Sequence, residues 1–563
     1  MCTPLRQTTG SSATGGLDRS VPLRATRTPC HEPAGPAIAP PAPAARRIRR
    51  AAAGRIRLAA ALLALAAGCG DNVTAAGDAG APDAAIPPAI GQFPDGFLWG
   101  TAIAPYQVEG DLHGTDWYQW ETECGSRCSG DSADDGPGFL VHHEADLDAA
   151  REMANNAIRL GIDWSRLFPT EESFPASPDP DAVALYHDII DAARARDLQV
   201  MVTLVHFALP SWIHDLTDRA ARPGWEGDAI VDRFARFAGW AAAEYGDDVD
   251  LWITINEPFV NVVGGWVSGD VPPGESLAID TGLAVAERMI RAHAAGYDAI
   301  HEMDTVDADG DGAAARVSIA QHSRVFVPKD PDDARQARAV EMFRYLLNDY
   351  FLIAVTRGDL DRNYDFDADD PGDAAADPSL AGRLDFIGLN YYGVTVVIAT
   401  ANDNAFPLIG IPFLNDLELQ GFDAPKSDFG WAIYPAGLRQ VIDELAPYQL
   451  PIIITENGIA DAGDALRPRF LIEHLYEVGR AIDEGAEVEG YFHWSLMDNF
   501  EWSSGYCPRF GLLRVDFDDP QRPRTAGAGA DTYRRIIEDG TVDPALFGEL
   551  AYGEPGYCPR LGL

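Results

Sequence analysis

Lysine is almost absent from the 563-residue chain, which contains only Lys329 and Lys426. Aspartate and glutamate total 87 against 43 lysines and arginines, so the formal net charge at pH 7 is −44. Such a charge makes sequence-independent binding to nucleic-acid phosphates unfavourable. Nucleic acid is therefore not expected as a partner. The acidity is interpreted as a contribution to solubility outside the cell or in salt.

The chain is also short of long apolar runs, and the one near its beginning has the order of an export signal. Six arginines between 46 and 57 precede the apolar run 58–67. This run is too short for a membrane-spanning helix, which needs about 20 residues, and it matches a cleaved secretory signal. Residues 66–69 (AAGC) resemble a bacterial lipobox, which predicts an extracytoplasmic protein anchored through lipidated Cys69. A plain signal peptide with a freely secreted product is the alternative.

The composition changes after this leader. Residues 1–69 are interpreted as the leader, and residues 70–90, rich in Ala, Gly, Asp and Pro, as a flexible linker. With 46% hydrophobic and 10% aromatic residues, the chain can bury a large core. We expect residues 91–563 to form one domain.

Three of the seven cysteines lie in the leader, which leaves Cys124, Cys128, Cys507 and Cys558. Export permits disulfides, and four cysteines allow three pairings. The first two close a tiny loop, and the other two lie in near-copies, GYCPRFGL and GYCPRLGL. We favour Cys124 with Cys128 and Cys507 with Cys558. A zinc site is the alternative, but no nearby histidine pattern supports it.

From residue 93 onward, short apolar runs alternate with longer amphipathic stretches. The runs are VMVTLVHF (200–207), LWITINEP (251–258), LDFIGLNYY (384–392) and PIIITENG (451–458), and helix-like stretches include 230–245, 283–303, 334–355 and 467–484. Such runs are typical of buried parallel strands. The repeated order predicts an α/β fold, a single (β/α)8 TIM barrel with its active site at the C-terminal ends of the strands.

Polar or acidic residues cluster at the C-terminal end of each of these runs. They are His206, Asn256 with Glu257, Asn390, and Glu456 with Asn457. Any one strand can end in polar residues simply because the chain leaves the core there. Four together are better explained by a shared site, since barrel enzymes place their chemistry at this end. Two glutamates are therefore expected at one mouth.

Four longer motifs in this part of the chain resemble glycoside hydrolase family 1, the β-glucosidase-like enzymes. They are FLWGTAIAPYQVEG (97–110), WITINEP (252–258), ITENG (454–458) and WSLMDNFEW (494–502), and the resemblance runs from about residue 93 to 516. Their order and spacing are highly specific. The resemblance implies a single (β/α)8 barrel that hydrolyses β-glycosides with retention.

The same resemblance implies roles for five residues. Glu257 would be the general acid/base and Glu456 the nucleophile, and a retaining enzyme holds two such carboxyl groups about 5 Å apart. Arg159 and Tyr392 match the residues beside the nucleophile, and Asn256 matches the one that bonds the sugar 2-hydroxyl. The chemistry requires Glu456 to be ionised and Glu257 protonated before reaction.

Further matched positions would bind the sugar. These are Gln107, His206, Asn390, Trp494, Glu501, Trp502 and Phe510. Two carboxyl groups need no metal or organic cofactor. DADGDG (307–312) resembles the start of a calcium loop, but Ser318 stands where the EF-hand has its glutamate, so we interpret it as a solvated acidic turn.

These residues predict an exo-acting retaining β-glycosidase, first of all a β-glucosidase. Glu501 would repel a phosphate group, which favours unphosphorylated sugars. The chain departs from the family pattern at Phe207, Ala208 and Ala432, although Phe207 would keep an aromatic wall. The alternatives are a β-galactosidase, β-fucosidase or transglycosidase of the same family, and a noncatalytic carbohydrate-binding protein.

Overall fold

A computed structural model describes residues 87–361, 376–399, 407–409, 424–556 and 558. All of them fall in the second of two units into which the chain divides, residues 49–563. The predicted leader, most of the linker and Cys69 lie outside the described residues. Within the part that the structure describes, no helix is both long and apolar enough to cross a membrane.

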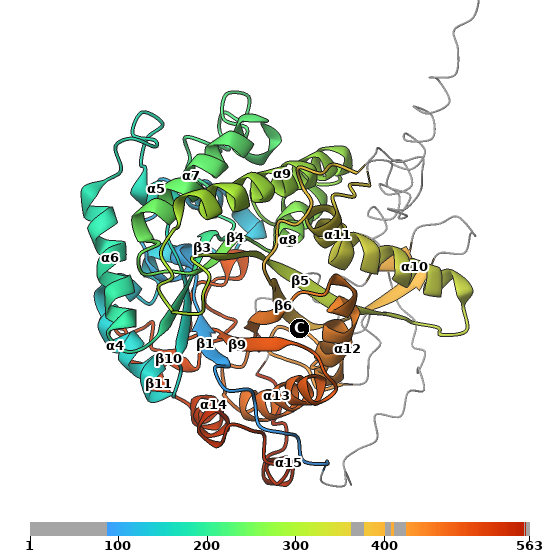
Figure 1. Cartoon of the computed structure of the whole chain (residues 1–563). Coiled ribbons are helices and arrows are strands. Elements are labelled where there is room, and N and C mark those ends of the chain that lie inside the picture. The colour runs from blue at the N-terminus through green and yellow to red at the C-terminus, as the bar shows by residue number, and fades with distance from the viewer. Residues whose placement is uncertain (1–86, 362–375, 400–406, 410–423, 557, 559–563) are drawn as a thin grey trace, which may run out of the picture. The chain divides into compact units, whose positions relative to one another are not determined.

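Eight parallel strands form a closed barrel, which confirms the predicted fold (Figure 1). Their order is β5-β4-β3-β2-β1-β9-β8-β6, and the barrel closes because β5 also pairs with β6. The strands are β1 (Leu98–Ala102), β2 (Ala157–Gly161), β3 (Gln199–Val205), β4 (Leu251–Asn256), β5 (Arg316–Pro328), β6 (Ile387–Ala399), β8 (Ile452–Asn457) and β9 (Val488–Trp494). A short strand, β7 (Pro407–Ile409), pairs antiparallel with β6.

Helices follow the strands and cover the outside of the barrel (Figure 1). They are α2 (Pro105–Val108), α3 (Asp116–Glu123), α4 (Phe139–Glu152), α5 (Trp164–Leu167), α6 (Pro180–Arg194), α7 (Ala229–Tyr245), α8 (Pro258–Val262), α9 (Ile279–Met303), α10 (Ala334–Arg344), α11 (Tyr350–Arg357), α12 (Pro435–Leu445), α13 (Arg467–Asp483), α14 (Ala528–Asp539) and α15 (Leu546–Glu549). An antiparallel pair, β10 (Leu513–Val515) and β11 (Arg524–Ala526), lies outside the barrel.

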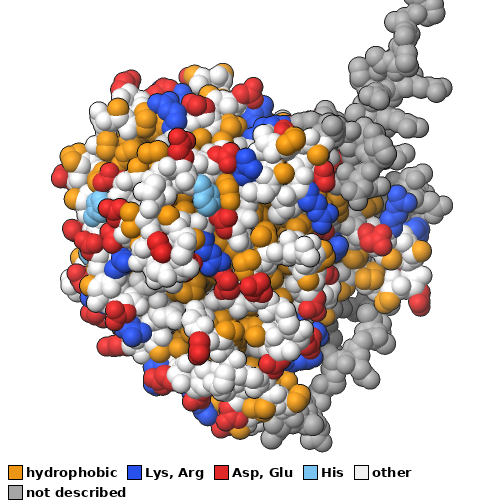
Figure 2. All heavy atoms as spheres, viewed as in Figure 1, with side chains coloured by type: hydrophobic (Ala, Val, Ile, Leu, Met, Phe, Trp, Pro, Cys, Tyr) orange, Lys and Arg blue, Asp and Glu red, His pale blue; other side chains and the backbone are white. Residues whose placement is uncertain are grey.

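The apolar runs become strands because both of their faces are covered. Every residue of β4 and of β8 is buried, as expected where helices cover a parallel sheet. One predicted helix is wrong in its continuity, since residues 334–355 form α10, a π-helical segment at Tyr345–Asp349 and then α11. Acidic and basic side chains are interspersed over the face shown in Figure 2.

Both favoured cysteine pairs form disulfides, and the zinc alternative is wrong. Cys124 at the end of α3 is joined to Cys128, four residues away. Cys507, in the loop after β9, is joined to Cys558, 51 residues away. The second bond ties the end of the described chain to a loop of the barrel.

We predict that removing the disulfide that closes the longer loop destabilises the protein more than removing the other disulfide. In the chain-entropy model, closing 51 residues contributes about 4 kcal/mol and closing four contributes about 2 kcal/mol. Cys558→Ser should therefore lower the thermal unfolding temperature more than Cys124→Ser, both measured under oxidising conditions. An equal or larger effect of Cys124→Ser would contradict this ranking.

The ends of β8 and β9 approach each other closely at Gly458. A Cβ atom added there would collide with the backbone carbonyl of Trp494. A backbone group cannot move aside as a flexible side chain can, so only glycine fits between the two strand ends.

Gly458→Ala should therefore lower the thermal unfolding temperature by several degrees. Gly463→Ala is the matched control in the same loop, because its Cβ would meet only ordinary contacts, the nearest at 3.7 Å from Asp461. Equal unfolding temperatures for the two variants would show that the strand ends can separate without cost.

Candidate active site

A cavity of about 540 Å³ lies at the C-terminal ends of the barrel strands. The strands β3, β4, β5, β6, β8 and β9 each contribute a residue in or just after the strand, namely His206, Glu257, His322, Tyr392, Glu456 and Trp494. The expectation that the polar strand ends share one mouth is confirmed for those of β3, β4 and β8, whereas Asn390 of β6 does not line the cavity. The two glutamates line the same cavity.

Glu456, in β8, is held at both carboxylate oxygens. Nη1 of Arg159 lies 2.6 Å from Oε1, and the hydroxyl of Tyr392 donates to Oε2 at 2.8 Å. The arginine is fixed in turn, because Nη2 donates to Oδ1 of Asn256 at 2.7 Å and Nε donates to Thr203. Glu456 and Arg159 are 4% and 1% exposed, so the pair is buried with a fixed geometry.

Glu257 follows β4 in the left-handed backbone region, with φ +43°. A residue other than glycine pays about 1–3 kcal/mol for such a conformation, and such strain gathers at functional sites. Its Oε1 accepts a hydrogen bond from Nδ2 of Asn390 at 2.9 Å and lies 3.0 Å from Nδ1 of His322. The backbone N–H of Glu257 donates to Ala320, which fixes the turn against β5.

The pKa values of the two glutamates shift in opposite directions. Burial raises the pKa of Glu456 above its usual range, although Arg159 opposes this shift. Burial would also raise the pKa of Glu257, but the attraction and hydrogen bond of His322, together with the hydrogen bond of Asn390 and the charge of Arg159, outweigh it and hold that pKa below its usual range. These directions are opposite to the expectation of an ionised Glu456 and a protonated Glu257. Burial is the main cause for Glu456, and His322, which is not among the predicted site residues, contributes most to lowering the pKa of Glu257.

Glu501 differs from the expected carboxylate. Burial, followed by repulsion from Glu456 and Glu257, raises the pKa of Glu501 to about 8. The group is therefore mainly a neutral carboxyl at pH 7, which weakens the expected repulsion of a phosphate by its charge. Its Oε2 is buried and has no hydrogen-bond partner among the described residues.

His206 lines the cavity and carries a buried ring nitrogen that has no partner among the described residues. Burial and the nearby Arg159 hold the pKa of His206 well below its usual range, so the ring is neutral. Its Nε2 lies 3.1 Å from the amide nitrogen of Asn256, which can only donate. The hydrogen-bond pattern therefore assigns the ring proton to Nδ1, which has no partner among the described residues.

Aromatic side chains form the walls of the cavity. Trp494 stacks on His206 with ring centroids 5.6 Å apart, and Phe207 packs edge-on against Trp502 at 5.1 Å. Phe207 thus keeps an aromatic wall, as expected. Trp431, beside Ala432, also lines the cavity, as does Phe510. Trp431 was not among the predicted site residues.

Three predicted residues do not line the cavity but support it. Arg159 holds Glu456, and Asn390 bonds both Asn256 and Glu257. Gln107 is fully buried, and its Nε2 donates to Asn499 at 3.1 Å and to the carbonyl of Phe500 at 2.9 Å. It therefore fixes the segment that carries Glu501.

His322 was missed although a signal for it exists. Gln321 and His322 follow the mainly apolar stretch VSIA (317–320), which is a weaker form of the pattern that identified four strand ends, because β5 continues beyond them to Pro328. This stretch was not among the predicted strands, so no site residue was predicted within it.

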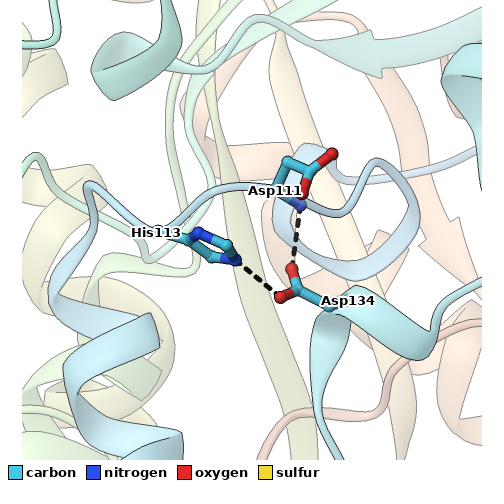
Figure 3. A group of neighbouring side chains, drawn as sticks. All are labelled: Asp111, His113 and Asp134. Carbon is cyan, nitrogen blue, oxygen red and sulfur yellow. Dashed lines mark hydrogen bonds and ion pairs between the residues drawn. The ribbon is translucent and has the colours of Figure 1, made fainter. Parts of the chain in front are cut away.

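Two groups of side chains outside the cavity lining bring potential metal ligands together. Asp111, His113 and Asp134 are all exposed. In Figure 3, Asp134 bridges the ring of His113, at 2.6 Å, and the backbone N–H of Asp111, at 2.9 Å. The other group is Asp250 with Asp307 and Asp309.

The second group includes the predicted acidic turn. The carboxylate of Asp307 accepts hydrogen bonds from the backbone N–H groups of Gly310 and Gly312. The turn thus uses its own carboxylates to satisfy its backbone, as Asx turns do. Neither group shares a residue with the cavity.

The chain is similar to known glycoside-cleaving enzymes over most of its length. Residues 89–541 match the model of glycosyl hydrolase family 1. A β-galactosidase from Pyrococcus woesei is 34% identical, with 82% of this chain and 100% of the relative covered. β-Glucosidase A from Thermotoga maritima is 30% identical, with 77% and 95% covered. The crystal structure of the β-glycosidase from Thermosphaera aggregans superposes with a TM-score of 0.73 at 28% identity, with 82% and 100% covered. The chain belongs to glycosyl hydrolase family 1 and is a β-glycosidase of that family.

Proposed function

We propose that the protein is an exo-acting retaining β-glycosidase in which Glu456 is the nucleophile and Glu257 the general acid/base. The observation that carries the proposal is the arrangement of Glu456. Arg159 and Tyr392 hold both of its oxygens within the cavity that Glu257 also lines. A carboxylate held in this way can attack a sugar without rotating away from it.

The proposed reaction has two steps. In the first, Glu257 gives its proton to the glycosidic oxygen, the bond from that oxygen to the anomeric carbon breaks, and Glu456 bonds to the carbon. In the second, Glu257 removes a proton from water, the water oxygen bonds to the same carbon, and Glu456 leaves as a carboxylate. Two inversions at one carbon give retention.

Residues around Glu456 would bind the terminal sugar. Asn256 is locked between Arg159 and His206, so one amide hydrogen remains to donate to the 2-hydroxyl. The Nδ1–H of His206 and the buried Oε2 of Glu501 offer a donor and an acceptor to further hydroxyls. Trp494, with Trp502 and Phe510, supplies apolar surface for the sugar ring.

The favoured sugar is an unphosphorylated β-glucosyl residue. Among the described residues that line the cavity, Arg127 is the one arginine or lysine. Its guanidinium already lies over Trp120 and donates to the carbonyls of Gly269 and Gly274. A phosphate dianion would thus be buried without a free cation to pair with it, which is costly.

β-Galactosides are the second candidate. The relatives named β-galactosidase are 32–34% identical to this chain, whereas those named β-glucosidase are 29–30% identical. Glucose and galactose differ only in the orientation of the 4-hydroxyl group. A neutral carboxyl at Glu501 can both donate and accept, so it can serve either orientation.

The cellular location of the protein is proposed from residues 46–69 alone. The arginine-rich segment, the apolar run and Cys69 support an extracytoplasmic enzyme, anchored by lipid or freely secreted.

Removing the nucleophile should abolish hydrolysis and permit a chemical rescue. Glu456→Gly should lower kcat for an aryl β-glucoside by at least about 10⁴-fold. Azide, which fits the space of the missing carboxylate, should restore turnover and yield the α-glycosyl azide. Glu456→Gln is the matched control, because its amide fills that space and should block rescue. A β-glycosyl azide, or no rescue by a folded Glu456→Gly protein, would contradict the assignment.

A panel of aryl β-glucoside, β-galactoside and β-fucoside should rank the sugars by kcat/KM, with the glucoside first. Glu501→Ala should lower kcat/KM for the best substrate by about 10- to 100-fold, because a sugar hydroxyl loses its hydrogen-bond partner. Product analysis separates hydrolysis from transfer to an acceptor sugar. Binding without turnover of any glycoside would indicate the noncatalytic carbohydrate-binding protein.

A further inference from the structure

His322 stands next to Glu257 although the two-carboxylate mechanism does not require it. Its Nδ1 lies 3.0 Å from Oε1 of Glu257, and its side chain is 14% exposed. The ring is stacked on Tyr392, with centroids 6.1 Å apart and planes 13° from parallel. The contact is thus fixed by packing on one side and by the carboxyl group on the other.

The closing seam of the barrel creates this contact. In the pairing of β5 with β6, His322 lies opposite Asn390, and in the pairing of β6 with β8, Asn390 lies opposite Glu456. Asn390 and His322 both meet Oε1 of Glu257. Oε2 is therefore the oxygen left to face the leaving group.

Charges around Glu257 act in opposite directions on its protonation. Arg159 and Arg324 favour the ionised carboxylate, whereas Glu456 disfavours it. Glu501 and Tyr392 are further titratable groups that interact with Glu257. Arg324 is buried, which lowers its pKa to about 10, so it remains a cation at neutral pH.

We propose that His322 and Glu257 share one proton and titrate as a single unit, with His322 storing the proton that Glu257 gives to the leaving oxygen. This inference rests on the proposed role of Glu257. In the stored form, His322 is an imidazolium and Glu257 a carboxylate. In the reactive form, the imidazolium has given up its proton, His322 is neutral and Glu257 is a carboxylic acid.

Both forms carry the same number of protons and the same total charge, so the exchange needs no other reactant. Glu257 then protonates the glycosidic oxygen and becomes a carboxylate beside a neutral His322. In the second step, the proton taken from water restores the pair. This explains how Glu257 acts as an acid although the structure favours its ionised form. His322 is therefore a positioning residue that acts through Glu257.

The sign of the pH effect follows from counting the sites that hold the proton. Two sites hold one proton more tightly than either site alone. The basic limb of kcat/KM reports loss of the last proton from this unit in the free enzyme. Without His322, Glu257 must hold the proton alone, so activity should be lost at a lower pH.

The test is the pH profile of kcat/KM for an aryl β-glucoside with a poor leaving group. His322→Asn and His322→Gln should both move the basic limb to lower pH, by about one pH unit. With a 2,4-dinitrophenyl glycoside, whose leaving group needs no acid, this difference should disappear. His187→Asn is the matched control, because His187 also lies 3.0 Å from a glutamate, Glu244, outside the cavity lining.

Two outcomes would contradict the proposal that His322 and Glu257 share one proton. An unmoved basic limb in folded His322 variants would show that the residue only fills space. A limb moved to higher pH would show that His322 acts as a fixed positive charge beside Glu257. An inactive wild-type enzyme would instead contradict the proposed glycosidase function, so the two failures can be told apart.

Discussion

The site depends above all on the buried ion pair between Arg159 and Glu456. A guanidinium that is 1% exposed must be paired and hydrogen-bonded, because an uncompensated buried charge costs about 3–5 kcal/mol. The pair meets this demand across the barrel, from β2 to β8, and Arg159 also reaches Thr203 in β3 and Asn256 in β4. One cation thus joins four strands.

The same hydrogen-bond network links Glu456 to Glu257. Oδ1 of Asn256 accepts from both Arg159 and Asn390, and Asn390 also donates to Glu257. Glu456 and Glu257 are therefore connected through Arg159, Asn256 and Asn390. Such a network holds the groups in place only if every member is satisfied, and its low exposure strengthens each electrostatic interaction. The buried carboxyl groups consequently influence one another's pKa values.

The fold and the principal glutamates could be predicted because their signals are local. Strands covered on both faces need continuous apolar runs, and the polar residues that end them stand out, as Glu257 and Glu456 do. The two disulfides were favoured from a short spacing and a repeated motif. Resemblance to a family added residues such as Arg159, whose place beside Glu456 no local pattern reveals.

What could not be predicted depends on neighbours that are distant in the sequence. His322 meets Glu257 only because β5 lies beside both β4 and β6. The opposite pKa shifts of the two glutamates, and the neutral Glu501, follow from burial and from charges brought together by the fold. The break between α10 and α11 was missed because no proline or glycine interrupts residues 334–355 to mark it.

The central claim is that Glu456 forms a covalent bond with the sugar, and trapping that intermediate tests it most directly. The enzyme would be treated with a 2-deoxy-2-fluoro-β-glucoside carrying a good leaving group, digested and analysed by mass spectrometry. The account predicts one fluorosugar on the peptide that contains Glu456, with loss of activity in proportion to labelling. A label on Glu257, or rapid turnover of ordinary glycosides by an enzyme that is never labelled, would contradict it.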